Sequence, residues 1–494
     1  MSDLKDKTIK GMMWSGINSF MQQTLGLLFS IVIARRLDPS DFGMVGMLTI
    51  FTAVATCLQD GGLVWAITNR KDVTHQQYSS VFWFNLILSG ILYIVLFCLA
   101  PLIASYFGHK ELVWLSRFVF LGIIFSSLGV VQTAYLFKQI RVKERAISMA
   151  MGLVVSGILG IILAYNGFSY WGIATQGILN IGVASLMLWI QSPFRPDFKI
   201  DWSFLKSIVP EGFRFVVPNI FVLAGENIFS VILGKNYTVR DVGNYSQAAK
   251  FNNAGYSSIL GMMRGVSQPV LVQVRDDKNQ YLNVFRKLLR MSAFVVTPIM
   301  FCLAMVSPEF IEIILTSKWI ESAYILRILC IGGLFSVLNT MMTYFIMSLN
   351  KTKLYMNLGV IISVLSVITA IVASHWGIIT LAYSYSLVQF FSFAIYYFFA
   401  RQTHPYSLKL LFNDIVPILG IGIVSVLISF YSTSFIQPIY LLLVTRVLFA
   451  LLVYFILMNL FKCDSYIEIK SYLYQKMINY LVKTERFERI FGIF

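Results

Sequence analysis

Charged and amide side chains stand within several long apolar stretches of this sequence, and seven of them are the residues that we single out as able to do chemistry. They are Gln22, Gln23, Asp60, Arg214, Glu226, Lys250 and Arg264. An ionised group in a membrane span costs about 2.5 to 3.5 kcal/mol on insertion scales, so we expect these groups to face a wet cavity, a partner or the interface. Cations in such a cavity can hold an anionic ligand through charge-assisted hydrogen bonds.

We assign each of these residues a predicted role. Six are predicted to line a substrate-binding cavity: Arg214, Lys250, Arg264, Gln22, Gln23 and Asp60. Glu226, deep in its apolar stretch, is the predicted site for a coupling cation. An alternative for Arg214, Arg264 and Asp60 is snorkelling to the headgroups, because they lie near span ends. An alternative for Glu226 and Lys250 is a purely structural ion pair.

Composition places these residues in a membrane protein. Of the 494 residues, 57% are apolar and 13% are charged, and the mean hydropathy is +0.74. A soluble domain is far more polar than this. The net charge of +16 does not point to nucleic acid, because the Lys and Arg lie between the apolar stretches and not in one patch. The scattered His and Cys residues predict neither a metal site nor a disulfide framework.

About fourteen apolar stretches are each long enough to cross a bilayer as a helix, which takes roughly 20 residues. The sequence therefore predicts an all-α integral membrane protein with about 14 transmembrane helices. Their expected ranges are 12–34, 42–64, 80–105, 113–134, 147–165, 170–190, 208–233, 243–267, 289–307, 322–348, 355–375, 377–400, 413–431 and 436–461.

Loop charges predict the orientation. Most Lys and Arg fall in segments that share a side with both termini, which the positive-inside rule places in the cytoplasm. The other loops are short and leave no room for a catalytic domain, so we predict no enzyme and no catalytic residues. Residues 466–489 are expected to form an interfacial helix, with a solvated tail as the alternative.

An internal repeat organises the spans. Ser30–Arg35 leads to Asp41-Phe-Gly43, and Ser230–Lys235 leads through a loop of equal length to Asp241-Val-Gly243. A second echo pairs Trp171–Thr175 with Trp376–Thr380. Such repeats predict two parallel six-helix lobes related by a pseudo-two-fold axis along the membrane normal, with a cavity between them. The predicted parts are an N-terminal lobe 1–200, a C-terminal lobe 201–405, two extra helices in 406–461 and a tail 462–494.

Several motifs resemble a known family. The strongest run from Ile33 to Gly43, Gln59 to Leu63, Asn69 to Thr74 and Val81 to Asn85, with looser matches at Val242–Tyr245, Gln268-Pro269 and Lys318-Trp319. They resemble the polysaccharide transporters, the Wzx-type flippases of the multidrug/oligosaccharidyl-lipid/polysaccharide exporter superfamily. One departure is that Phe229 stands where this family often has an acidic residue, with Glu226 one turn earlier.

The resemblance implies a function in the bacterial inner membrane. A flippase of this kind moves undecaprenyl-pyrophosphate-linked repeat units to the outer leaflet for capsule, O-antigen or exopolysaccharide assembly. Its expected partners are that glycan lipid, the bilayer, and possible neighbours such as a polysaccharide polymerase and glycosyltransferases. The alternatives are a peptidoglycan-precursor flippase, a cation-coupled multidrug antiporter or, ranked last, a polysaccharide polymerase or ligase.

The sequence contains no P-loop for nucleotide hydrolysis. We therefore expect no cofactor, with coupling to H⁺ or Na⁺ as a possible source of energy.

Overall fold

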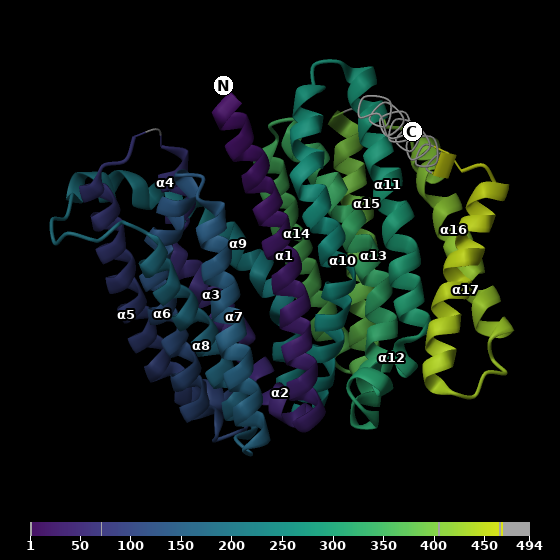
Figure 1. Ribbon diagram of the computed structural model, residues 1–494, viewed down its shortest axis with the longest axis horizontal. Helices are drawn as coiled ribbons and strands as arrows, with labels where there is room; N and C mark the ends of the chain where they lie inside the picture. Colours follow the sequence, from purple (N-terminus) through teal and green to yellow (C-terminus); the bar gives the residue numbers. More distant parts are fainter. Residues whose placement is uncertain (1, 71, 404–405, 464–465, 468–494) are drawn as a thin grey trace, which may run out of the picture.

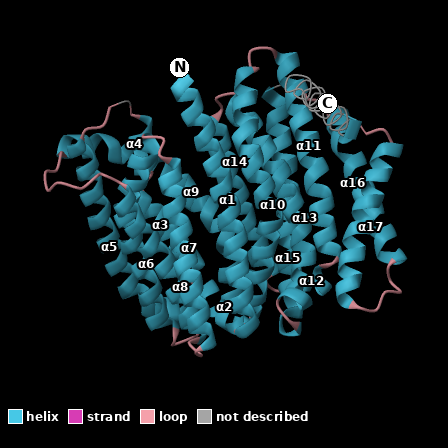
Figure 2. Cartoon of the chain, viewed as in Figure 1, coloured by secondary structure: helices cyan, strands magenta, loops and turns pink. Residues whose placement is uncertain are grey.

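The computed structural model of the chain consists of long α-helices that run side by side (Figures 1 and 2). It describes residues 2–70, 72–403, 406–463 and 466–467, and these form helices, turns and loops without a β-strand. The predicted all-α class is confirmed. The interfacial helix predicted over 466–489 falls, apart from its first two residues, outside the described residues.

The first part of the chain folds into eight helices. They are α1 (Ser2–Arg36), α2 (Pro39–Gly46), α3 (Thr49–Asp60), α4 (Leu63–Asn69), α5 (His75–Phe107), α6 (Leu112–Lys138), α7 (Val142–Tyr165) and α8 (Ser169–Gln191). The path from α3 to α4 breaks at Gly61 and Gly62, whose φ angles are +56° and +66°. Glycine adopts this left-handed backbone without steric cost, so the break is encoded locally.

The second part repeats this plan and then adds a helical hairpin. Its elements are α9 (Trp202–Asn236), α10 (Val239–Gln273), α11 (Lys278–Met305), α12 (Ser307–Ile314), the 3-10 turn η1 (Ser317–Trp319), α13 (Ile320–Ser348), α14 (Thr352–Ala373), α15 (Ile378–Thr403), α16 (Leu408–Ser432) and α17 (Ile439–Leu460).

Twelve helical segments among the described residues are long and apolar enough to cross a membrane. The chain is thus a multi-pass membrane protein, and the count of fourteen stays a prediction. The long helices that do not qualify are α1 and α10, which carry polar residues such as Gln22 and Gln23 on α1 and Lys250, Asn252 and Asn253 on α10. A polar helix among apolar ones needs a polar environment to face.

Equivalent helices pack in the same pairs in the two parts. α1 packs on α7 as α9 packs on α14, α5 on α6 as α11 on α13, and α6 on α8 as α13 on α15. The sequence repeat is therefore also a repeat of packing, which supports two parallel lobes. The exact lobe boundaries at 200 and 405 remain a prediction.

The first sequence echo has a local cause at the helix starts. The Asp41 carboxylate accepts a hydrogen bond of 3.0 Å from the backbone nitrogen of Asp38, and the Asp241 carboxylate accepts one of 3.1 Å from that of Thr238. Both aspartates close a capping box, which satisfies backbone donors left open at a helix N-terminus. The aspartate of each repeat thus fixes where α2 and α10 begin.

The second echo lies where predicted, at the starts of α8 and α15, but its two glycines differ. Gly172 is part of α8, whereas Gly377 precedes α15 with a φ of +102°. The shared sequence Trp-Gly-Ile therefore adopts a different backbone conformation at each of the two sites.

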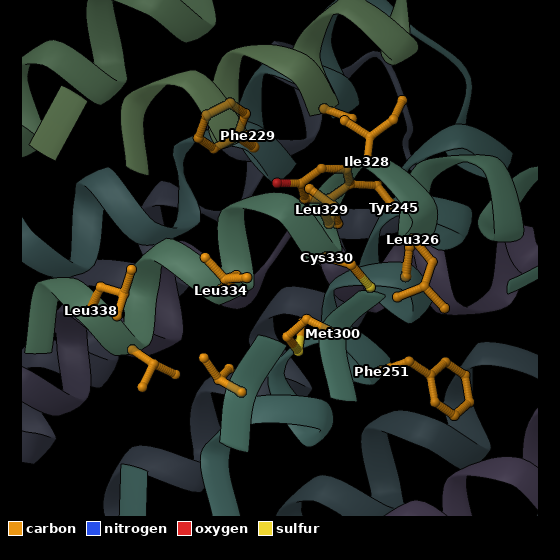
Figure 3. Close-up of a cluster of buried hydrophobic side chains, with 14 of the residues drawn as sticks. Phe229, Tyr245, Phe251, Met300, Leu326, Ile328, Leu329, Cys330, Leu334 and Leu338 are labelled. Carbon is orange, nitrogen blue, oxygen red and sulfur yellow. The ribbon is translucent and has the colours of Figure 1, made fainter. Parts of the chain in front are cut away.

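The core of the second part forms around α13 (Figure 3). Side chains from α13 such as Leu329, Cys330 and Leu334 are about 1% exposed or less and pack against neighbouring helices. Phe229 of α9 stacks on Tyr245 of α10 with ring centroids 6.1 Å apart. This core gives the surrounding helices a fixed frame.

Two ionic clusters attach the α16–α17 hairpin to this frame. Asp414 of α16, 2% exposed, accepts bonds of 2.7 and 2.8 Å from Arg286 of α11 and one of 2.9 Å from Tyr406. At the other end of the hairpin, Arg446 of α17 pairs with Glu309 of α12. This ion pair joins α17 of the hairpin to α12.

Candidate functional site

A polar cavity of about 1150 Å³ lies among α1, α9, α10, α13, α14 and α15, and α3, α7 and α8 each add one residue to its wall. Its wall reaches Met347, next to the last residue of α13, and Tyr355 in the first turn of α14. On α10 the wall begins only at Tyr245, more than a turn after that helix starts. The cavity therefore extends toward the end of the molecule where α13 ends and α14 begins.

The wall is polar but nearly free of charge. Its side chains are mostly of three kinds, carboxamides, tyrosines and small hydroxyls. The carboxamides are Gln22, Gln23, Gln176, Asn227, Asn252, Asn253, Gln268, Asn339 and Gln389, and the tyrosines are Tyr245, Tyr256, Tyr344, Tyr355, Tyr385 and Tyr396. Among the described lining residues, Glu226 and Lys250 are the charged ones.

The structure brings four of the seven predicted site residues to this cavity. Gln22, Gln23, Glu226 and Lys250 are lining residues, and Glu226 and Lys250 are exposed to its space. They come from α1, α9 and α10, which meet at this cavity. Whether these side chains bind substrate or a coupling ion stays a prediction.

Two predicted lining residues lie elsewhere. Asp60 ends α3, beside the glycine break, and Arg214 lies on the part of α9 that packs near that break; neither belongs to the described lining. For Arg264 the helix position on α10 is described but the side chain is not. Of the cations expected in the wall, the described lining therefore contains Lys250, and its charge is balanced by that of Glu226.

The residue that departs from the family pattern has a structural role. Phe229 is 2% exposed and packs between Tyr245 and the ring edge of Tyr385, with centroids 6.1 and 5.9 Å away. Both residues belong to the cavity lining, but Glu226, one turn earlier, is exposed there whereas Phe229 is buried. A carboxylate in the place of Phe229 would stand in an aromatic cluster, where burial of a charge is costly.

Sequence reasoning missed the tyrosines, all of which come from the second part of the chain. A pair of glycines makes room for them. A Cβ on Gly332 would lie 2.5 Å from the Tyr385 ring, and one on Gly333 would lie 2.4 Å from the Asn252 side-chain oxygen and 3.0 Å from the Tyr256 ring. The Gly-Gly pair inside an apolar stretch was the signal available in the sequence, because glycine in a helix often marks close packing.

The opposite end of the molecule, near α2 and α12 in Figure 1, is closed by contacts between the two parts. Arg35 donates to the backbone oxygens of Ile314 and Ile313 at 2.7 and 2.6 Å. Trp319, fully buried, donates to the backbone oxygen of Ala34 at 3.0 Å. We call this set of residues the closed end. Two segments that carry the family resemblance, Ile33–Gly43 and Lys318-Trp319, meet here.

A helix crossing completes the closed end. A Cβ on Gly43 would lie 1.9 Å from the backbone oxygen of Val239, and one on Gly243 would lie 1.8 Å from that of Pro39. Any side chain larger than hydrogen would clash, so these glycines let α2 and α10 touch through their backbones. The glycine of each repeat therefore seals one lobe against the other.

A many-helix bundle with a polar cavity, closed at one end by contacts between its two parts, defines a membrane transporter by class. The chain belongs to the polysaccharide biosynthesis protein family, whose pattern matches residues 32–324. The family resemblance read from the motifs is thereby confirmed.

Curated relatives agree with this membership. The lipopolysaccharide biosynthesis protein WzxC of Escherichia coli is 24% identical over 67% of this chain and 68% of its own length. The teichuronic acid biosynthesis protein TuaB of Bacillus subtilis is 23% identical, covering 83% of this chain and 85% of its own.

Solved structures share the fold. A lipid II flippase MurJ in an inward closed conformation superposes with a TM-score of 0.75 at 18% identity, over 91% of this chain and 99% of MurJ. An inward-facing multidrug resistance transporter of the MATE family gives a TM-score of 0.62 at 18% identity, over 77% of this chain and 94% of its own. These likenesses concern the fold alone.

Proposed function

We propose that this protein is a flippase that moves lipid-linked oligosaccharide repeat units across the bacterial inner membrane for surface polysaccharide assembly. The observation that carries the proposal is the hydrogen-bonding cavity of about 1150 Å³, closed at one end, in a member of the polysaccharide biosynthesis protein family. Sugar hydroxyls cannot enter hydrocarbon without losing their hydrogen bonds, and carboxamides and hydroxyls of the wall replace them.

Alternating access would work through the closed end. With both termini in the cytoplasm, as the loop charges predict, the closed end faces outward and the cavity is reached from the cytoplasmic side. The glycan and its pyrophosphate enter this cavity while the polyprenyl chain stays in lipid. Rocking of the two lobes then separates Arg35 and Trp319 from their carbonyl partners and opens the outer side.

A cation gradient is our proposal for the energy source. Glu226 is the carboxylate on the described cavity wall, and it lies within a membrane-spanning helix. A carboxylate there can bind H⁺ or Na⁺ in one state of the cycle and release it in the other. No cofactor and no nucleic acid enter this scheme, and glycosyltransferases and a polymerase are the proposed neighbours in the pathway.

Within the same superfamily, a peptidoglycan-precursor flippase is the second candidate, and the fold shared with MurJ is the observation that favours it. A cationic-drug antiporter fits less well, because Lys250 balances Glu226 on the described wall. The names of the polysaccharide relatives weigh in favour of a repeat-unit substrate.

Deletion of the gene provides the test. We expect the deletion strain to lose surface polysaccharide and to retain lipid-linked repeat units in the inner leaflet, where they resist a glycosidase added to intact spheroplasts. A plasmid copy should restore both. Normal surface polysaccharide in the deletion strain would refute the proposal.

A further inference from the structure

An apolar groove of about 610 Å³ lies along α14 and α15. Its wall on α15 runs from Ser384 to Phe399, and at 1.5 Å per residue this stretch is about 22 Å long. Leu387, Phe391 and Phe398 of this wall are more than half exposed. Apolar side chains exposed along membrane-spanning helices meet lipid tails, so the groove opens toward the hydrocarbon of the bilayer.

Both hydroxyl groups of the described groove lining are used within their own helices. The Thr369 hydroxyl donates to the backbone oxygen of Leu365 at 2.8 Å. The Ser384 hydroxyl donates to the backbone oxygen of Leu381, also at 2.8 Å. A hydroxyl bonded in this way to the preceding turn of its helix no longer needs a partner outside it. The groove therefore suits a hydrocarbon chain.

The same two helices wall the polar cavity with residues that directly neighbour those of the groove. On α14, Leu365 lines the groove and Ser366 lines the cavity. On α15, Phe391 lines the groove and Ser392 lines the cavity. Val388 lines both spaces. The groove and the cavity are thus the two sides of one seam between α14 and α15, apolar outside and polar inside.

The seam is fastened at the closed end. A turn there joins α14 to α15, and the Tyr237 hydroxyl donates at 2.6 Å to the backbone oxygen of Ser374 and accepts at 2.8 Å from the backbone nitrogen of Gly377. At the other end α14 begins at Thr352 and α15 ends at Thr403, so no turn of the chain joins them. The two helices can therefore part more easily at that end, toward which the cavity extends.

A lipid-linked substrate needs a seam of this kind. Its glycan and diphosphate require polar partners, whereas its polyprenyl chain gains nothing by leaving hydrocarbon. Such a molecule can occupy the cavity only if its chain leaves through a wall, and at Val388 the cavity adjoins a groove that suits the chain. A bilayer phospholipid also fits the groove, but it has no head group in the cavity to hold it there.

We propose that the seam between α14 and α15 is the lateral passage for the carrier lipid, with the polyprenyl chain in the apolar groove and the diphosphate and glycan in the cavity. This inference rests on the proposed flippase function and locates the lipid part of its substrate. Phe391 and Ala394 of the groove wall then contact the chain, and Val388 lies where the chain passes between the helices.

Photolabelling tests where the chain lies. The photoreactive residue p-benzoylphenylalanine replaces Phe391 in the groove wall or, as the control, Phe449 on α17, which is 37% exposed and lies outside the described lining of groove and cavity. Each full-length protein is illuminated in proteoliposomes that contain an undecaprenyl diphosphate disaccharide with a radioactive sugar. We expect strong labelling at position 391 that an excess of unlabelled substrate removes, and weak labelling at position 449 that the excess does not change.

A steric variant tests whether the passage is used. Ala394→Trp fills the groove, whereas Val444→Trp adds the same ring at a half-exposed position on α17. We expect Ala394→Trp to slow transport of the undecaprenyl diphosphate disaccharide several-fold and Val444→Trp to leave the rate unchanged. Both proteins should bind equally well a disaccharide diphosphate that carries a short water-soluble chain, because the cavity is unaltered.

The outcomes separate this passage from the proposed function. Equal labelling at positions 391 and 449, or equal transport by the two tryptophan variants, would overturn the passage and leave the flippase function standing if the unmodified protein transports the substrate. Labelling at position 391 that excess substrate does not reduce would show contact with bulk phospholipid and would also overturn the passage. Unmodified protein that unfolds cooperatively on heating but transports no substrate would count against both.

Discussion

Gly43 and Gly243, the equivalent glycines of the two repeats, lie against each other where α2 crosses α10. A Cβ built on Gly243 would stand 3.1 Å from the backbone nitrogen of Gly43 and 1.8 Å from the backbone oxygen of Pro39. The contact is reciprocal, since Gly43 approaches Val239 in the same way. The Asp-x-Gly motif is a sign of internal duplication in the sequence. In the structure its glycines also allow the close contact that holds the two lobes together at the closed end.

Substitution of one of these glycines should open the seal. We expect Gly243→Ala to force α2 and α10 apart, to lower the melting temperature by several degrees and to abolish the transport cycle, because overpacking at a tight contact costs about 1 to 3 kcal/mol. Glycan transport in proteoliposomes and thermal unfolding measure the two effects. Gly261→Ala is the matched control, because a Cβ on this other glycine of α10 meets nothing within 4 Å. Equal transport rates and melting temperatures of the two variants would contradict a requirement for glycine where α2 crosses α10.

The glycine pair of α13 should control the shape of the cavity. Gly333→Ala would push on the side chains of Asn252 and Tyr256, which line the cavity. We expect weaker glycan binding with little change in membrane insertion. Gly90→Ala, on α5 with open space around its Cβ position, should leave binding and expression unchanged. Titration of purified protein with a synthetic undecaprenyl diphosphate disaccharide compares the variants, and unaltered affinity in Gly333→Ala would refute this role.

Lys250 should be required for transport of the diphosphate. We expect Lys250→Ala to abolish surface polysaccharide while protein abundance in the membrane stays at the wild-type level, because a charge-assisted contact to phosphate is lost. Lys250→Arg should keep part of the activity. Lys278→Ala removes an exposed lysine at the start of α11 and serves as the control. Wild-type glycan levels in Lys250→Ala cells, measured by surface polysaccharide staining, would refute the assignment.

Glu226 should couple transport to a cation. In proteoliposomes with an imposed pH or Na⁺ gradient, we expect the Glu226→Gln protein to transport at a rate that no longer depends on the gradient, because the amide cannot ionise. Glu312→Gln, an exposed position on α12, should retain the response. A gradient response that survives in Glu226→Gln would exclude this carboxylate as the coupling site.

Asp414 should be required for the attachment of the α16–α17 hairpin. Its loss leaves Arg286 and Arg290 facing each other without their shared carboxylate, and breaking a buried pair costs about 3 to 5 kcal/mol. We expect Asp414→Asn to lower the melting temperature markedly and to reduce abundance in the membrane. Asp276→Asn changes a 96% exposed carboxylate and should be neutral. A melting temperature for Asp414→Asn equal to that of Asp276→Asn would show that the cluster adds no stability.

Local features of the chain were predictable from the sequence. Apolar stretches of spanning length determined the all-helical membrane fold, because a helix satisfies its own backbone hydrogen bonds in lipid. Asp41 and Asp241 marked equivalent helix starts, since capping depends on residues three apart. The polar residues of α1 and α10, among them Gln23 and Lys250, pointed to a cavity, because such residues are costly in contact with lipid.

Tertiary packing decided the rest. The sequence could not tell that Asp60 and Arg214 lie away from the cavity, because the direction a side chain faces depends on which helices surround it. Nor could it predict that Gly43 packs against the backbone of Val239. Contacts between residues so far apart in the sequence form only when the two complete lobes dock. Local hydropathy and capping act over a few residues, whereas the seal and the wall of the cavity form between surfaces far apart in the chain.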